Sequence, residues 1–334
     1  MNYKAIMKYG RGAFSMVLSA VFAVSVASSV AAAPKKDKYL FLTGSTPQFA
    51  APVVAVEKGW CKDMGLDVEI RKFTSGGVAA QSFIAGQGDF MDTGDWPAVR
   101  TWLLTQDKDD PIVGLAPDAY YGDLTVIMAK SEIKDPKQLK GKKIGVWLGT
   151  TSEFFAGLYL DKHGVPLDSV KYVNVQPAEM VPALDSGDLD AFVMWQPFGW
   201  KSQEVSGNKV HELSTAEGYF TEFVVVSTRK SLLDNDPDAA KVMIQCMKKG
   251  GEWAAKNQQE ASKIVGDFFK IPPETVMKMI SVMNMDPTFS TKFRKDMDDL
   301  NNFMMSKDQS KSRINWNKHF DARGLETADP MLVK

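Results

Sequence analysis

The sequence has few residues of the kinds that build metal sites and nucleophilic active sites. It contains two cysteines and three histidines in 334 residues, and His163, His211 and His319 lack the spacing of a metal-binding motif. No G-x-S-x-G elbow, P-loop, H-E-x-x-H motif or plausible Cys/His pairing occurs in it. We therefore expect a protein without metal or cofactor that is not an enzyme.

An excess of positive charge and late apolar runs are also lacking. Lys and Arg number 40 against 41 Asp and Glu, and the formal net charge is −1. No basic stripe is present that could neutralise phosphates, which argues against nucleic-acid binding. After the N-terminal segment no apolar run approaches the length of a transmembrane helix, so we expect the rest of the chain to be soluble.

The N-terminal segment has the three parts of a secretory signal peptide. Basic residues come first, residues 13–30 carry no charge, and small residues follow them. We place the cleavage after Ala32, so that residues 1–32 are removed and the chain is exported. An uncleaved anchor is the alternative, because the apolar run is long.

The two cysteines, Cys61 and Cys246, permit two states. An exported chain meets an oxidising compartment, in which they could pair as a disulfide. Two buried free thiols are the alternative. No cysteine directly follows the apolar run, so we do not expect a lipid-anchored form.

Two stretches about a hundred residues apart repeat one pattern. Gly88-Asp89 leads into a short apolar run that ends at Trp96-Pro97, and Gly187-Asp188 leads into another that ends at Trp195 and Pro197. The pattern predicts a tight turn, a buried strand and a new helix at the carboxyl end of the strand. Open α/β sheets bind ligands at these ends, so two such units indicate two α/β lobes that face one cleft. For each tryptophan alone, simple packing of the sheet end is the alternative.

Strands alternate with helices in two sets along the chain, which predicts two largely parallel sheets covered by helices. Glycine, proline and hydroxyl residues mark most ends of these elements. Besides the two runs before the tryptophans, the expected strands are 39–43, 68–73, 112–116, 124–129, 144–148, 170–175, 210–213 and 223–227. The expected helices are 47–58, 74–86, 96–106, 135–143 in part, 149–162, 177–184, 237–253, 258–269, 273–283 and 291–305.

The chain leaves the first set of elements, builds the second and returns to a tail that is helical only. We place the two connecting segments near Gly122-Asp123 and Thr221-Glu222. Two crossings make a hinge with few degrees of freedom, suited to closing over a ligand. The predicted fold is therefore α/β, with a discontinuous first lobe (residues 39–122 and 223–334) and a second lobe (residues 123–222).

The sharpest local signal is Gly149-Thr150-Thr151-Ser152, a strand end followed by three hydroxyl residues at a helix start. Unsatisfied N–H groups and the positive end of the helix dipole make such a turn an anion site without a basic side chain. Thr150 and Glu153 also have capping-box spacing, so the alternative is that they only stabilise the helix. Both can hold at once, because a box leaves the N–H groups of Thr151 and Ser152 available.

Further candidates lie near predicted strand ends and crossings. Ser45 and Thr46 offer a similar helix start, for which an ordinary N-cap is the alternative. The acidic candidates for holding a cationic group, otherwise solvated charges or caps, are Asp92, Asp95 and Glu222. The aromatic candidates for lining a pocket, otherwise core residues, are Trp96, Tyr120, Trp195 and Phe198.

Several short stretches together carry a resemblance to a known family. They are Arg71-Lys72-Phe73-Thr74-Ser75-Gly76-Gly77, Ala85-Gly86-Gln87-Gly88-Asp89, Leu139-Lys140-Gly141-Lys142-Lys143-Ile144, Gly149-Thr150-Thr151, Val173-Asn174-Val175-Gln176-Pro177, and Gly187-Asp188-Leu189-Asp190-Ala191 with Trp195-x-Pro197. These stretches resemble the periplasmic substrate-binding proteins of nitrate/sulfonate/taurine-type ABC importers, most closely the taurine- and alkanesulfonate-binding members. The likeness runs from about residue 39 to residue 227, with a weaker helical tail.

The resemblance implies a two-lobed periplasmic binding protein of the type II kind. In that family hydroxyls and helix-start N–H groups hold the anionic head between the lobes, which falls here on Ser45, Thr46, Thr150, Thr151 and Trp195. The implied partners are a small organic ligand, such as a sulfonate or amino-sulfonate, and the permease of an ABC importer. We expect a periplasmic monomer.

One departure from the family concerns Asp95-Trp96, where taurine-type members tend to have small hydroxyl residues. It adds a charge and a large ring to the expected pocket wall, and favours a ligand with a cationic or hydrogen-bond-donating end beside an apolar part. A thiamine-pyrimidine precursor or another small organic acid is the alternative ligand. A periplasmic enzyme on the same scaffold and a ligand-sensing partner of a receptor are the alternative functions.

Overall fold

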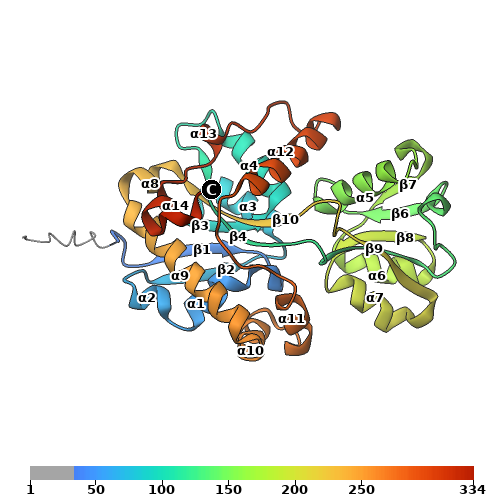
Figure 1. Cartoon of the computed structure of the whole chain (residues 1–334), viewed down its shortest axis with the longest axis horizontal. Coiled ribbons are helices and arrows are strands. Elements are labelled where there is room, and N and C mark those ends of the chain that lie inside the picture. Colours follow the sequence, from blue (N-terminus) through green and yellow to red (C-terminus); the bar gives the residue numbers. More distant parts are fainter. Residues whose placement is uncertain (1–33) are drawn as a thin grey trace, which may run out of the picture. The chain divides into compact units, whose positions relative to one another are not determined.

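A computed structural model describes residues 34–334, and the predicted signal peptide lies outside these described residues. Two five-stranded sheets, each covered by helices, form two lobes (Figure 1). The strands are β1 (Tyr39–Thr43), β2 (Val68–Lys72), β3 (Phe90–Gly94), β4 (Ile112–Tyr121), β5 (Thr125–Lys130), β6 (Lys143–Val146), β7 (Lys171–Asn174), β8 (Ala191–Trp195), β9 (Val210–Thr215) and β10 (Glu222–Arg229).

The two sheets have equivalent strand orders, β2-β1-β3-β10-β4 in the first lobe and β7-β6-β8-β5-β9 in the second. β1 runs parallel to β2 and β3, and β6 runs parallel to β7 and β8. The fourth strand of each sheet, β10 or β5, is antiparallel to both of its neighbours. Each of these strands enters its sheet directly after a crossing, which is why each sheet is mixed rather than purely parallel.

Helices cover both sheets, and the long ones of the tail belong to the first lobe (Figure 1). The α-helices are α1 (Ala50–Glu57), α2 (Trp60–Asp63), α3 (Gly76–Ile84), α4 (Asp95–Thr105), α5 (Thr151–Lys162), α6 (Pro177–Ser186), α7 (Phe198–Ser206), α8 (Lys230–Asn235), α9 (Pro237–Lys256), α10 (Gln258–Phe269), α11 (Pro273–Ile280), α12 (Thr291–Ser306), α13 (Trp316–His319) and α14 (Arg323–Ala328). The 3-10 helices are η1 (Pro47–Phe49), η2 (Pro136–Leu139), η3 (Leu167–Ser169), η4 (Gly207–Lys209) and η5 (Pro330–Leu332). Among these described helices, none is long and apolar enough to cross a membrane.

The predicted α/β fold with two sheets, two crossings and a helical tail is confirmed, with corrections to its details. The first crossing strand, β4, continues to Tyr121, five residues beyond the predicted end, because its pairing with β10 extends to Glu222. The 3-10 segment η1 precedes α1 where one helix was expected. The short helices α2, α8, α13 and α14 were not predicted, since each has six residues or fewer and carries little periodicity.

A disulfide joins Cys61 on α2 to Cys246 on α9. Of the two states that the sequence permitted, the structure therefore has the disulfide and not the two free thiols. Both residues are buried within the core of the first lobe. That core packs the faces of the first sheet against α1, α3, α4 and the tail helices. The second lobe has smaller clusters on the two faces of its own sheet.

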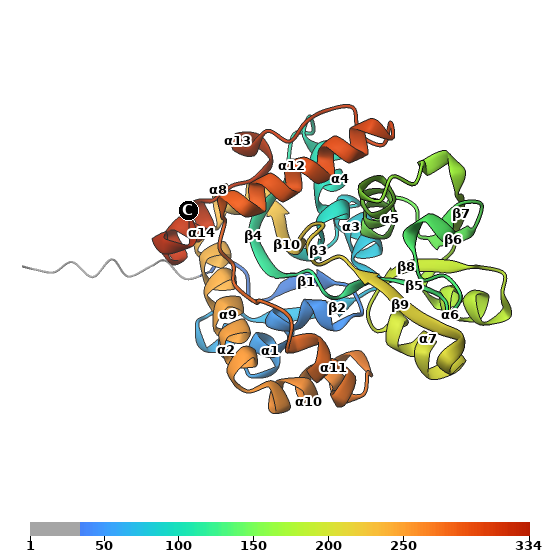
Figure 2. The same cartoon turned by 45° about the vertical axis from the view of Figure 1, so that its right-hand side comes forward.

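The tail helix α12 belongs to the first lobe but also contacts α5 of the second (Figure 2). The ring of Phe303 lies 5.1 Å from that of Phe154, and its edge fills the space that a side chain at Gly157 would need. Just beyond α12, Nε2 of Gln309 donates to both carboxylate oxygens of Glu153 at 3.1 and 3.2 Å. The lobes are therefore joined by this contact as well as by the two crossings.

Candidate functional site

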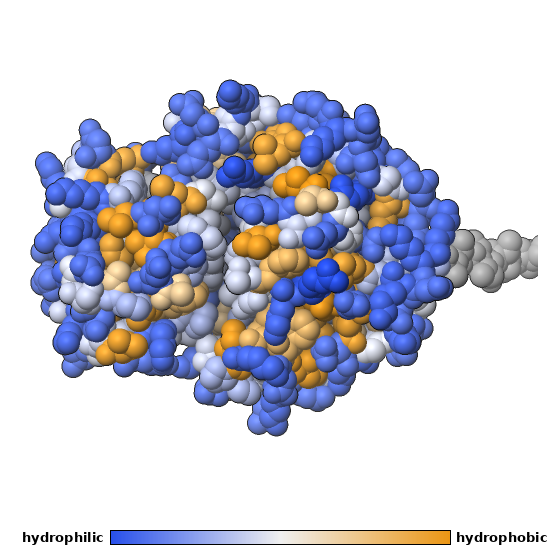
Figure 3. All heavy atoms as spheres, turned by 180° about the vertical axis from the view of Figure 1, so that it is seen from behind, coloured by the Kyte–Doolittle hydropathy of each residue, from blue (hydrophilic) through white to orange (hydrophobic). Residues whose placement is uncertain are grey.

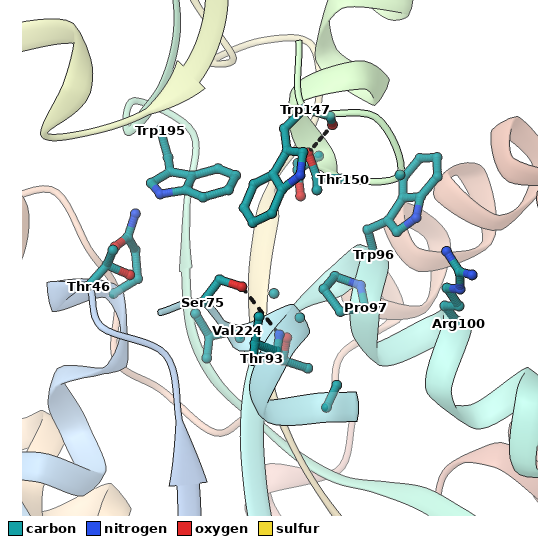
Figure 4. Close-up of a pocket in the computed structure, with 18 of the residues that line it drawn as sticks. Thr46, Ser75, Thr93, Trp96, Pro97, Arg100, Trp147, Thr150, Trp195 and Val224 are labelled. Carbon is teal, nitrogen blue, oxygen red and sulfur yellow. Dashed lines mark hydrogen bonds between the residues drawn. The ribbon is translucent and has the colours of Figure 1, made fainter. Parts of the chain in front are cut away.

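A cavity of about 420 Å³ lies between the two sheets. It is bounded by strand ends and helix starts from both lobes, as Figure 4 shows for part of its lining. Seen from behind, the surface is hollowed by a groove between the lobes, with hydrophobic patches on both sides (Figure 3). The lining residues used below are Ser45, Thr46, Gln48, Ser75, Gly76, Gly77, Thr93, Trp96, Arg100, Tyr121, Trp147, Thr150, Thr151, Trp195 and Glu222.

Five α-helices begin at the cavity: α3, α4, α5, α6 and α7. Their N-terminal N–H groups have no partners within the helix, and their dipoles place partial positive charge there. Ser75 caps α3 by accepting from the N–H of Val78 at 3.3 Å. Helix α3 can lie this close to β3 only because Gly76 has no side chain. A Cβ there would be 2.6 Å from the hydroxyl oxygen of Thr93.

The hydroxyl groups of the predicted anion site on α5 all have partners within the protein. Thr150 donates to the carbonyl of Trp147 at 2.6 Å and accepts from the N–H of Ser152. Ser152 is fully buried, and its hydroxyl donates to the carbonyl of Val193. The hydroxyl of Thr151 donates across the cleft to Asp95 on α4 at 2.9 Å. In this structure the site can therefore offer a ligand the backbone N–H of Thr151, but neither that of Ser152 nor these hydroxyl donors. This corrects the expectation that both N–H groups remain available.

The predicted capping box also has a different geometry. Glu153 does not reach back to the N–H of Thr150; its carboxylate accepts from the N–H of Gly149 at 2.8 Å. Gly149 adopts a positive φ of 74°, which glycine tolerates without strain. The box is thus displaced by one residue, and Glu153 stabilises the turn before the helix.

The opposite wall, in the first lobe, contains polar atoms without partners. The hydroxyl of Thr93, Nε1 of Trp96 and Oε1 of Gln48 are buried and form no hydrogen bond. Buried polar atoms are nearly always paired, so three such atoms around one cavity are unusual. They make this wall the side that gains most from a ligand with complementary polar groups.

Two tryptophans of the second lobe face this wall. The rings of Trp147 and Trp195 lie 5.9 Å apart with an interplanar angle of 39° (Figure 4). Both are partly exposed and line the cavity. Their flat apolar faces suit an organic group rather than a small inorganic ion.

Among the described residues, the cavity lining has one basic side chain, Arg100, and one acidic side chain, Glu222. Arg100 is exposed on α4, and one of its terminal nitrogens lies 3.9 Å from where a side chain at Gly149 would begin. Glu222 is 5% exposed and accepts hydrogen bonds from the hydroxyls of Tyr121 and Thr125. Burial, together with the nearby charge of Asp95, raises the pKa of Glu222 to about 8.

Asp95 does not line the cavity, which corrects the prediction that its carboxylate faces a ligand. It is 2% exposed and accepts from its neighbour, the N–H of Trp96, and from the hydroxyl of Thr151. Burial raises its pKa to about 6, although both hydrogen bonds oppose the shift. Asp95 is the first residue of α4, and its carboxylate bonds to the backbone of α4 and to Thr151 at the start of α5. Asp95 therefore links the starts of these two helices.

Three other predicted residues are also absent from the lining, and one of them, Asp92, is buried in the core of the first lobe. Tyr120 packs against Phe223 and pairs with Asn284 instead, because the longer β4 directs the next residue, Tyr121, to the cavity. Ser152 is buried behind the start of α5. The structure does bring together the other eight candidates from the sequence, namely Ser45, Thr46, Trp96, Thr150, Thr151, Trp195, Phe198 and Glu222.

Sequence reasoning missed several lining residues. Arg100 lies one turn after Trp96 and Pro97 on α4, and this helical spacing was the signal that could have identified it. Ser75, Gly76 and Gly77 were placed at a helix start but not at the site. Trp147 had no signal beyond its place at the end of a predicted strand. Phe198 was expected either to line a pocket or to pack in the core, and the structure places it in the lining of the cavity.

The two-lobed architecture has counterparts among solved structures. The periplasmic aliphatic sulphonate binding protein SsuA from Escherichia coli superimposes with a TM-score of 0.74 over 86% of this chain and 92% of that chain, at 13% identity. This likeness establishes the class of fold, a periplasmic binding protein fold.

Sequence comparisons specify the family. The chain belongs to the NMT1/THI5-like family, whose model matches residues 46–261. A putative binding protein of Brucella abortus is 30% identical over 65% of this chain and 67% of its own length. A putative aliphatic sulfonates-binding protein of Bacillus subtilis is 27% identical over 70% of each chain. The resemblance found in the sequence motifs is thereby confirmed.

Proposed function

We propose that this protein is the periplasmic solute-binding component of an ABC importer and captures a small organic anion, of the sulfonate or amino-sulfonate class, in the cavity between its lobes. The observation that carries the proposal is the first-lobe wall. There the unpaired groups of Thr93, Trp96 and Gln48 lie beside the start of α3 and the cation of Arg100. An anionic head with several oxygens would accept from the hydroxyl of Thr93, Nε1 of Trp96 and Arg100, and would meet the helix dipole. Oε1 of Gln48 is an acceptor and would need a donor group of the ligand.

The organic part of the ligand lies against Trp147 and Trp195 in this proposal. The tryptophan faces are apolar, whereas the opposite wall lacks hydrogen-bond partners. A ligand with one polar and one apolar end fits this asymmetry. The name of the Bacillus subtilis relative, an aliphatic sulfonates-binding protein, supports the same ligand class.

The lobe boundaries support a hinge-closing mechanism. One sheet contains the strands of residues 39–121 together with β10, and the other contains the strands between residues 125 and 215. The proposed lobe boundaries, at residues 122–123 and 222–223, therefore separate the two sheets. The one exception is Glu222, which is the first residue of β10 but falls on the second-lobe side of the boundary. Ligand contacts from both walls exist together only when the lobes are close, so ligand binding favours the closed state. In the proposed role the closed monomer then delivers the ligand to the permease, and binding rather than catalysis is its function.

Calorimetry with propane-1-sulfonate tests the proposal. Replacing Arg100 by Gln should weaken binding about 10- to 100-fold, because a charged hydrogen bond contributes about 1.5–3 kcal/mol. Arg313→Gln is the matched control, since Arg313 is exposed and bonds to Asn302 outside the cavity. Mass spectrometry of the ligand released from purified protein identifies the natural compound. Absence of binding by any organic anion in a panel, and release of none, would refute the proposed ligand class.

A further inference from the structure

Glu222 occupies a distinctive place, because it touches both crossing segments and the cavity. It is the first residue of β10, where the chain returns to the first lobe. One carboxylate oxygen accepts from the hydroxyl of Tyr121, at the end of β4, at 3.0 Å. The other accepts from the hydroxyl of Thr125, at the start of β5 in the second lobe.

The charged groups around Glu222 do not compensate its charge. Asp95 on α4 is the nearby carboxylate, and Asp296 on α12 acts in turn on Asp95. Tyr121 on β4 is a neutral donor, and Arg100 on α4 lines the same cavity without an ion pair to either acid. Within residues 34–334, neither Glu222 nor Asp95 forms a salt bridge. A buried carboxylate without a cation is costly, and protonation is the usual way to remove that cost.

We propose that Glu222 determines which charge class of ligand the cavity accepts: it holds a proton in the empty cavity, and a ligand with an ammonium group displaces that proton. The ammonium N–H then donates to the Glu222 carboxylate, and the released proton passes to the solvent. A ligand with only an anionic group binds while Glu222 keeps its proton. The proposal rests on the proposed function, because it concerns the cationic end of the same ligand.

The direction of the pH dependence follows from the raised pKa of Glu222, which lies at about 8. At neutral pH the protonated form of Glu222 is therefore the major one. As the pH is raised toward 8, affinity for an amino-sulfonate should therefore increase, by at most about tenfold for each pH unit, and it should level off above pH 8. Affinity for a simple sulfonate should be constant below pH 8 and fall above it, because a negative charge then appears beside the ligand.

The proton on Glu222 can be measured without any ligand. Carbon-13 NMR of the protein labelled at glutamate side chains follows each carboxyl group through a pH titration, and Glu222→Gln assigns the Glu222 signal by its loss. We expect this signal to titrate well above the ordinary range for glutamate. Titration within the ordinary range would overturn the proposal, whichever ligands bind.

Ligand-linked proton release is then measured by calorimetry in two buffers with different ionisation heats. Taurine and propane-1-sulfonate are the probes, since they are similar in size and only taurine carries an ammonium group. At pH 7 taurine should release about one proton, and propane-1-sulfonate none. Glu222→Gln should abolish the release, whereas Glu217→Gln, at an exposed residue, should leave it unchanged.

The outcomes separate this inference from the proposed function. Taurine binding without proton release overturns the role of Glu222 and leaves the sulfonate proposal standing. Failure of both probes to bind refutes the proposed ligand class, and the NMR titration still decides whether Glu222 holds a proton. Proton release that persists in Glu222→Gln assigns the proton to another group and also overturns the inference.

Discussion

The two lobes share a strand order but differ in how completely their buried polar atoms are paired. In the described part of the chain, every buried side-chain oxygen or nitrogen without a partner belongs to the first lobe. These atoms are on Thr43, Gln48, Asp92, Thr93, Trp96 and Asp118. In the second lobe, Thr150 and Ser152, which were expected to bind an anion, are bonded within their own lobe. Three of the six residues with unpaired atoms, Gln48, Thr93 and Trp96, line the cavity. The difference teaches that, in the described residues, unpaired buried polar side chains lie on the first-lobe side of the cavity, whereas the buried polar side chains of the second lobe have partners.

The largest expected effect comes from distorting the first-lobe wall at Gly76. In Gly76→Ala the new Cβ would lie 2.6 Å from the hydroxyl and 3.1 Å from the Cα of Thr93, so the start of α3 must move. We expect a loss of about 1–3 kcal/mol in unfolding free energy and at least tenfold weaker ligand binding. Denaturant titration and calorimetry measure the two effects.

Gly77→Ala is the control for that change. A Cβ at Gly77 would meet only the hydroxyl of Ser75, at 3.7 Å, which is ordinary contact. Stability and affinity should stay near wild type, because this glycine is in a helix and alanine is favoured there. Equal weakening by both variants would mean that the close approach of Gly76 to Thr93 is not what shapes the wall.

A second prediction concerns Asp92 and Asp118, two carboxyl groups buried in the core of the first lobe. Burial raises the pKa of both, to about 7 for Asp118, and the neighbouring Asp118 raises the pKa of Asp92 further. A raised carboxyl pKa means that the folded state holds its protons more tightly than the unfolded chain. This stabilisation is full below pH ~4 and is lost as the pH rises through the folded pKa values.

Replacing Asp92 by Asn should therefore stabilise the protein more at pH 7.5 than at pH 5. We expect a difference of about 1–2 kcal/mol between the two pH values, measured by urea unfolding of the variant and the wild type. Asp188→Asn, on an exposed turn of the second lobe, serves as the control and should be neutral at both. A variant as pH-sensitive as the wild type would show that Asp92 is ionised in the fold.

The smallest effect on binding is expected at Thr150, whose hydroxyl is fully used within the second lobe. Thr150→Ala removes the N-cap of α5 and should cost about 1 kcal/mol of unfolding free energy. Ligand affinity should fall less than about threefold, since no hydroxyl donor to the ligand is lost. A tenfold loss of affinity without loss of stability would reverse the comparison between the lobes.

The sequence predicted best those features that local residues determine. The strand at 39–43 and the helix starts at Ser75 and Thr150 follow from alternation, glycine and capping residues, and the structure has them at these positions. Tyr120 was named from the sequence as a pocket residue, whereas the structure places Tyr121 in the lining. Which side of a strand faces a cavity depends on its pairing, and the pairing of β4 with β10 is irregular at Val224–Ser227.

Long-range packing accounts for the rest. The side chain of Asp95 bonds to Thr151, a residue of the other lobe, and no local pattern encodes that partner. Arg100 on α4 and Trp147 after β6 line one cavity although they belong to different lobes, and no local pattern in the sequence indicates this. The structure therefore places most of the predicted residues around one cavity, whereas the contacts among them could not be predicted from the sequence.

The disulfide between Cys61 and Cys246 has a consequence for the covalent chain. The residues between them, a separation of 185, include the entire second sheet, so that lobe is an insertion within a covalently closed loop. A single proteolytic cut in any turn of the second lobe leaves both fragments attached, and the nicked protein stays one molecule until a reductant is added. In the chain-entropy model, closing a loop of this length disfavours the unfolded state by about 5 kcal/mol. The second lobe is thus a part of the chain in which a single cut does not separate the two fragments.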